Sequence, residues 1–293
     1  NVAYQTNMLW NGQFWATDLN VGTEYAWADD TPPVVNNLGF EGLESQAIAG
    51  FGIHRMTVEE SLLLTDPTYL NLFDTAFPSY PEAERITDVT VGLAMAAFER
   101  TVLANKSPFQ RWLHGDFNAM TIQEKEGAIL FFGKANCSSC HNGPALNSMA
   151  FYALGMNDLN NSNALNINPN DAAHLGRGGF TNKPEDNYKF KVPQLYNLKS
   201  SPFYGHGASF TSVKDVIRYK NEAIAENTQV PNEQIAEGFV PLLLNEQEIT
   251  AITTFIENAL YDPQLSRYEP ANLPSGNCFP NNDSISSSDL GCD

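Results

Sequence analysis

The feature that most restricts the fold of this chain is the pentapeptide Cys137-Ser138-Ser139-Cys140-His141. A C-x-x-C-H sequence is the attachment signature of a c-type haem. Two thiols three positions apart can form thioether bonds to the two vinyl groups of one porphyrin, and the adjacent imidazole can then ligate the iron. A redox-active C-x-x-C would need a βαβ setting, and half a zinc site would need two further ligands nearby. We therefore predict one covalent haem c, held by Cys137, Cys140 and His141.

The other two cysteines, Cys278 and Cys292, lie in a tail rich in Ser, Asn, Gly and Pro. A disulfide between them is the simplest interpretation, and two unpaired thiols are the alternative. Such a bond persists only in an oxidising compartment, and c-type haem in bacteria is likewise assembled outside the cytoplasm. Both cysteine pairs therefore predict a periplasmic or extracellular protein.

Acidic residues outnumber basic ones along the whole chain. Its 293 residues include 16 Lys and Arg against 34 Asp and Glu, which gives a formal net charge of −18. Nucleic-acid binding needs clustered Lys and Arg, so we predict no nucleic-acid partner. No apolar run approaches the roughly 18 to 20 residues that cross a bilayer, so we predict no transmembrane segment. Residues 1–20 lack the pattern of a signal peptide, and we expect a chain that is already processed or incomplete at its start.

Helical signals begin near residue 50, whereas residues 1–50 are rich in Asn, Gly and aromatics and predict surface loops. Residues 141–190 contain many Asn, Gly and Asp, and they predict a long irregular segment. Apolar side chains recur at helical spacing at Val89, Leu93, Ala96 and Ala97.

Three capping boxes mark the starts of helices, the first of them Thr57 with Glu60. Thr121 with Glu124 begins a helix that leads into the haem motif. Asn245 with Glu248 begins a strongly periodic helix, which we expect to end before Pro263. The fold is therefore predicted to be mainly α.

Several further segments resemble the bacterial di-haem cytochrome c peroxidase and MauG family. Residues 190–197, FKVPQLYN, and residues 201–207, SPFYGHG, are similar to its F-K-V-P-x-L-R-N and A-P-Y-M-H-D-G signatures. Shorter matches occur in the family's order at residues 9–13, 43–47, 97–101, 175–177 and 273–276. The resemblance covers nearly the whole chain.

This resemblance implies cytochrome-c-like domains with long irregular loops. Residues 1–115 would be the remainder of a first such domain, residues 116–265 the C-terminal haem domain, and residues 266–293 a disulfide-closed tail. The family carries two C-x-x-C-H motifs, the first upstream of the segment that matches at Trp10. The chain is then a fragment, or the first haem lies on another polypeptide, or this member has one haem.

The ligand opposite His141 differs from that of the peroxidases, which use a Met. An ungapped alignment places Tyr204 at that position, and MauG-like members use Tyr there. A phenolate would favour ferric iron. A one-residue gap would instead bring His206 into register with the family's His, and Met156 is a further ligand candidate. The alternative roles are a buried hydrogen-bonded tyrosine and, for His206, a contact with a haem propionate.

Other family positions are matched with changes. The Glu that moves protons during O–O cleavage is replaced by Arg55, which stays protonated, and His54 lies beside it. His54 could exchange protons and Arg55 could polarise a peroxide, or both are ordinary surface residues. Trp10 matches a tryptophan thought to relay electrons between the two haems, but without a first haem it is better interpreted as a packing aromatic.

The resemblance also implies two further ligand contacts. Arg177 would contact a haem propionate. Main-chain oxygens at Asn1, Ser200 and Pro202 would correspond to the family's interdomain calcium site.

The implied activity is that of a periplasmic haem oxidoreductase. It would reduce hydrogen peroxide with electrons from a small redox protein, a cytochrome c or a cupredoxin, or oxidise a protein substrate as MauG-like members do. The negative charge could steer a basic donor. A haem with both His141 and Tyr204 as ligands would leave no open site for peroxide. The alternative is an electron-transfer or structural cytochrome that kept the fold and lost the peroxidase centre.

Overall fold

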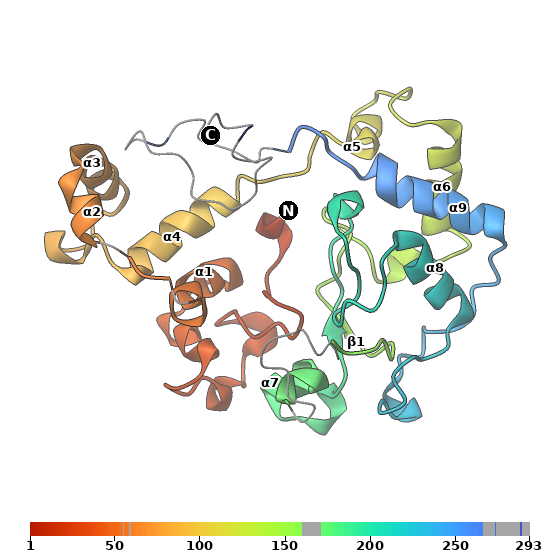
Figure 1. Cartoon of the computed structure of the whole chain (residues 1–293), viewed down its shortest axis with the longest axis horizontal. Coiled ribbons are helices and arrows are strands. Elements are labelled where there is room, and N and C mark those ends of the chain that lie inside the picture. The colour runs from red at the N-terminus through yellow and green to blue at the C-terminus, as the bar shows by residue number, and fades with distance from the viewer. Residues whose placement is uncertain (55, 59, 160–170, 266–272, 274–287, 289–293) are drawn as a thin grey trace.

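A computed structural model describes residues 1–54, 56–58, 60–159, 171–265, 273 and 288. Arg55 and the expected disulfide between Cys278 and Cys292 lie outside these residues. The helices form two lobes that lie side by side, one made by helices of residues 42–99 and the other by helices of residues 108–132 and 213–254 (Figure 1). None of the helices described has the length and apolar character needed to cross a lipid bilayer.

The N-terminal lobe contains four helices: α1 (Gly42–Ile53), α2 (Glu60–Thr65), α3 (Pro67–Ala76) and α4 (Asp88–Glu99). Its core forms where α1 crosses α4, because Gly92 lets the two backbones approach. A Cβ at Gly92 would lie 2.6 Å from Cγ1 of Ile48. Of the four apolar residues predicted to form the buried face of α4, Ala96 alone is buried, beside Thr90 and Gly92. The prediction missed this face because its residues are small or polar.

Helix α1 was not predicted, since residues 1–50 were expected to be loops. Eight of its twelve residues are buried. A helix buried on nearly every side carries no polar stripe, so it lacks the alternation on which sequence recognition depends. Before Gly42 the chain does consist of short 3-10 turns and irregular segments.

The C-terminal lobe contains α5 (Pro108–Leu113), α6 (Ile122–Phe132), α8 (Val213–Glu222) and α9 (Glu246–Thr254), followed by a π-helical turn at Phe255–Ala259. Helix α7 (Arg177–Thr181) lies apart from these helices, at the bottom of Figure 1. A short antiparallel pair, β1 (Phe151–Tyr152) and β2 (Phe190–Lys191), aligns Phe151 with Lys191. The predicted capping boxes at Thr121 and Asn245 are confirmed. Apart from β1, α7, the first residue of β2 and short 3-10 turns, the described part of residues 141–190 is irregular, as expected.

Helices α6 and α9 cross in close contact at Gly127. A Cβ at this position would overlap the carbonyl oxygen of Ala251, so only glycine allows the observed distance between the helices. Phe109 of α5 packs edge-on against Phe255, with ring centroids 5.3 Å apart. The buried core of this lobe thus extends from Ala104 to Leu260. It includes α5, which precedes the predicted domain boundary near residue 115.

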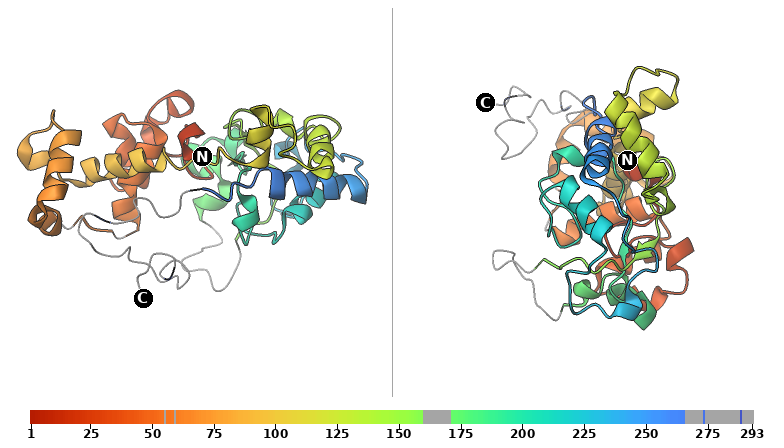
Figure 2. Two further views of the ribbon diagram at one scale, coloured as in Figure 1. Left: turned by 90° about the horizontal axis from the view of Figure 1, so that it is seen from above. Right: turned by 90° about the vertical axis from the view of Figure 1, so that its right-hand side faces the viewer.

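The N-terminal segment runs between the two lobes, as Figure 1 and the two further views in Figure 2 show. The guanidinium of Arg177 donates to the carbonyls of Asn11 (3.2 Å) and Leu19 (2.7 Å), and to Oδ1 of Asn20 (3.0 Å). Nζ of Lys191 donates to the carbonyl of Asn7 at 2.6 Å. These bonds fix the first twenty residues against the C-terminal lobe.

Candidate haem site

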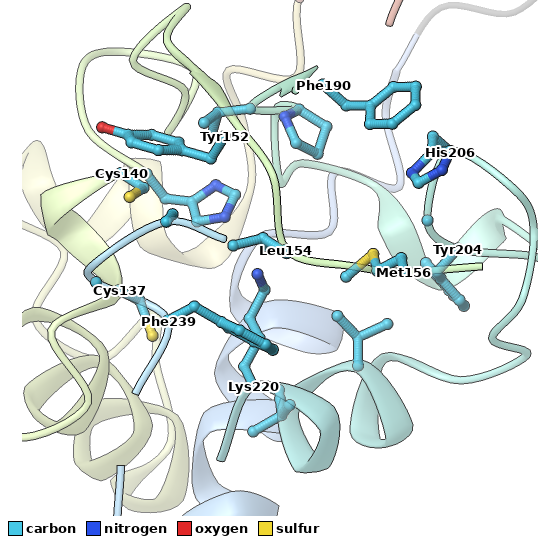
Figure 3. Close-up of a pocket in the computed structure, with 18 of the residues that line it drawn as sticks. Cys137, Cys140, Tyr152, Leu154, Met156, Phe190, Tyr204, His206, Lys220 and Phe239 are labelled. Carbon is cyan, nitrogen blue, oxygen red and sulfur yellow. The ribbon is translucent and has the colours of Figure 1, made fainter. Parts of the chain in front are cut away.

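A cavity of about 880 Å³ lies in the C-terminal lobe, between α8, α9 and the loops that carry the predicted ligands. Its size is within the roughly 300–1,000 Å³ of small-molecule and cofactor sites. The walls are mainly apolar and include Val213 and Ile217 of α8 and Ile252 of α9. Figure 3 draws 18 of the residues that line it and labels ten of them.

The haem motif reaches this cavity directly after α6. Asn136 has a positive φ of 49°, which turns the chain out of the helix. Cys137–Ser139 then forms a 3-10 turn, and the amide of His141 donates to the carbonyl of Cys137 at 2.8 Å. The turn brings Cys137, Cys140 and His141 to the same wall, where both thiols are unpaired.

The imidazole of His141 is oriented and kept neutral. Its Nδ1 lies 3.0 Å from the carbonyl oxygen of Leu146. Burial, with a smaller contribution from the positive charge of Lys220, lowers the pKa of His141 to about 4. A neutral imidazole whose other nitrogen is held by a carbonyl is the form that ligates a metal.

Burial also raises the pKa of the Cys137 thiol to about 11. A redox-active C-x-x-C needs the opposite, a lowered thiol pKa. Within the described part of the chain, no group of three or more His, Cys, Asp and Glu side chains is arranged to hold a metal ion. The raised thiol pKa thus disfavours the redox alternative. Two thiols and an imidazole on one wall of a large apolar cavity fit haem c.

Tyr204 and Met156 lie together at the other end of the cavity (Figure 3). The Tyr204 hydroxyl donates to the carbonyls of Leu198 (2.8 Å) and Ser201 (2.9 Å). Burial raises the pKa of Tyr204. As an iron ligand, this side chain would have to release both carbonyls and lose its proton.

His206 also lines the cavity, but its ring is held by protein groups. Its Nε2 lies 3.1 Å from Oδ1 of Asp158. The ring stacks on Phe190 at 3.5 Å and meets the edge of Trp10 at 6.4 Å, both measured between ring centroids. Trp10 lines the cavity and is 39% exposed, so it borders both the cavity and the surface.

The remaining predicted residues lie elsewhere. Arg177 is not among the cavity-lining residues; its guanidinium lies over the Phe151 ring at 4.5 Å and binds the N-terminal segment, an arrangement that does not favour the expected propionate contact. His54 ends α1 at an exposed position outside the cavity. Asn1 borders a second cavity of about 280 Å³, which neither Ser200 nor Pro202 lines. The calcium site stays a prediction.

Two lysines of the site were missed by the sequence analysis. Lys220 lines the haem cavity from α8, on the same face as Val213 and Ile217. A charge at the i+7 position of an apolar helical face was the signal that could have revealed it. Lys191 is buried between the lobes, and this burial lowers its pKa to about 8.

Curated proteins similar to this chain include relatives named cytochrome c peroxidase and MauG. The family model described as di-haem cytochrome c peroxidase matches residues 1–118. The cytochrome-c peroxidase IdrP1 of Pseudomonas sp. is 31% identical over 266 residues, which cover 80% of this chain and 67% of that protein. The cytochrome c peroxidase Ccp of Escherichia coli is 36% identical over 160 residues, covering 53% of this chain and 32% of the relative. MauG of Methylorubrum extorquens is 29% identical over 199 residues, which cover 67% of this chain and 50% of MauG.

Solved structures agree in fold. A MauG-like protein associated with microbial copper homeostasis superposes with a TM-score of 0.58 at 26% identity, over 70% of this chain and 61% of that one. The dihaem peroxidase BthA of Burkholderia thailandensis superposes with a TM-score of 0.53 at 14% identity, over 88% of this chain and 67% of BthA. This chain spans between about a third and two thirds of the length of the curated relatives named above. Its mainly helical fold, its cavity and these relatives agree: the chain belongs to the di-haem cytochrome c peroxidase family, the haem oxidoreductases that include MauG.

Proposed function

We propose that this protein is a periplasmic c-type haem oxidoreductase that reduces hydrogen peroxide with electrons from a small redox protein. Cys137 and Cys140 would attach one haem c, and His141 would ligate its iron. The observation that carries the proposal is the 880 Å³ cavity, which has these three side chains on one wall and Tyr204 and Met156 at its other end. Haem c bound there supplies one-electron chemistry.

The protein groups around the cavity would orient and shield the cofactor. The Leu146 carbonyl fixes the ring of His141, and burial keeps that ring neutral. The apolar side chains of α8 and α9 exclude water. Tyr204, the proposed distal ligand, would exchange its two carbonyl partners for the iron and release its proton.

A distal protein ligand would leave no place for peroxide in this cavity. We therefore propose that this site transfers electrons and that peroxide reacts at a second haem, as the family's di-haem character implies. Trp10 borders both the cavity and the surface, which supports a role in passing electrons out of the cavity. His54 and Arg55 would belong to the peroxide side.

The electron donor would be a small basic cytochrome c or a cupredoxin with a basic docking face. A net charge of −18 favours such a partner through long-range attraction, which speeds association at low ionic strength. Oxidation of a protein substrate, as implied by the similarity to MauG, is the other outcome available to the same site.

A second candidate is an electron-transfer cytochrome without peroxidase activity. The observation that favours it is the position of His54, exposed and outside the cavity. The two functions separate in one experiment on protein produced with a cytochrome c maturation system and shown by its pyridine complex to carry two haems, because the peroxide reaction is proposed for the second haem. We expect covalent haem, and peroxide-dependent oxidation of a reduced small cytochrome c that is abolished in C137A/C140A. Covalent, reducible haem without peroxide turnover would support the electron-transfer cytochrome.

A further inference from the structure

The side chain of Lys220 is the unusual feature of the haem cavity. Helix α8 faces the cavity with Val213, Val216 and Ile217, and Lys220 follows on the same face. Figure 3 shows its side chain pointing into the cavity, toward Leu154. An ammonium group thus takes a position where the helix otherwise presents apolar side chains.

In the described parts of the chain, Lys220 lacks the protein partners that hold three other lysines of this lobe. Lys191 donates to Asn7, Lys199 to Asn258 and Lys214 to Thr250. For Nζ of Lys220, no hydrogen bond or ion pair exists among the residues that the structure describes. The side chain is half-buried, so its ammonium faces the cavity without a counter-charge from any described residue. An anionic group of a ligand that fills the cavity can supply that charge.

Haem c is a ligand that carries such groups. It would bring two propionate carboxylates into the same space, and an ammonium–carboxylate pair is a strong, charge-assisted interaction.

We propose that Lys220 is a haem-binding residue whose ammonium pairs with a haem propionate inside the cavity. The proposal rests on the attachment of haem c proposed above. Pairing offsets the negative charge of the propionate, which otherwise stabilises ferric over ferrous iron. Lys220 therefore raises the reduction potential of this haem.

The test compares K220M and K220Q with K214M in holoprotein. Lys214 lies on the same helix but pairs with Glu246 outside the cavity, so its replacement removes the same charge from a site outside the cavity. Covalent haem is counted first, from the absorbance of the denatured pyridine complex. Wild-type protein without covalent haem would defeat the proposed function itself, whatever the variants do.

With haem attached, we expect a lower midpoint potential in K220M and K220Q, and an unchanged one in K214M. The propionate bending band in the resonance Raman spectrum should shift in the two Lys220 variants alone. K220Q keeps the length and polarity of the side chain, so it provides the test if K220M does not fold. A potential and a propionate band equal to those of wild type would overturn the proposal. So would a changed electron paramagnetic resonance signal of the ferric iron, which would identify Lys220 as an axial ligand.

Discussion

Nε2 of His206 lies 3.1 Å from Oδ1 of Asp158, and this pair joins two loops on the wall opposite the haem motif. Both side chains are about 10% exposed. Asn227 donates to the other oxygen of Asp158 at 3.0 Å. Gly207 reinforces the contact, because a Cβ there would overlap the carbonyl oxygen of Asn157. The loop that carries Tyr204 is thereby held against the segment that carries Met156.

A double-mutant cycle should measure this contact. We expect D158A and H206A to be coupled by about 1–3 kcal/mol in the free energy of unfolding, as for a buried hydrogen bond to a charged group. Burial alone would raise the pKa of Asp158, but the hydrogen bond and charge of His206, helped by His174, lower it overall. The coupling energy should therefore be fully present above the pKa of an unfolded Asp side chain. It should disappear as the pH falls through the lowered pKa of Asp158 in the folded protein. Additive single variants at neutral pH would show that the pair does not hold the loops together.

The spectrum of the Y204F variant should show whether Tyr204 is the distal ligand. If Tyr204 ligates ferric iron, the variant should lose the phenolate modes in the resonance Raman spectrum, and its midpoint potential should rise because a hard anionic donor is removed. M156L is the matched control, since Met156 lies beside Tyr204 in the same cavity. A spectrum that changes in M156L and not in Y204F would assign the ligand to Met156.

The sequence could not decide between Tyr204 and Met156 as the distal ligand, but it did predict the local features of the site. The haem motif and the capping boxes depend on residues within five positions of one another, so their local chemistry was visible in the sequence. Arg177 contacts groups more than 150 positions away, and no local pattern encodes that. Helix α1 was hidden because it is buried on nearly all sides. Lys220 was overlooked because a lysine is normally assigned to the solvent-facing side of a helix.

The crossing of α6 and α9 provides a test of the fold. We expect G127A to lower the free energy of unfolding by about 1–3 kcal/mol, since the added methyl group would force the two helices apart. G52A is the control: Gly52 lies in α1, and a Cβ there would meet no atom within 4 Å. Alanine is the better helix former, so G52A should be neutral or stabilising by up to about 1 kcal/mol. Chemical denaturation of both variants measures the difference, and equal stabilities would contradict the close crossing.

Lys191 should make stability depend on pH in the alkaline range. Its burial lowers the pKa to about 8 in the folded protein, from an ordinary value of 10.5. Between these pH values the unfolded chain binds more protons than the folded one, so stability rises with pH across this window. The free energy of unfolding of wild type relative to K191M should therefore increase by up to about 3 kcal/mol from pH 8 to pH 10.5. K199M is the control, because it removes an exposed lysine of the same lobe. The difference in the free energy of unfolding between wild type and K199M should stay constant over this pH range. If the free energy of unfolding of wild type minus that of K191M stays constant or falls as the pH rises, Lys191 is hydrated in the folded protein. The N-terminal segment then does not cover it.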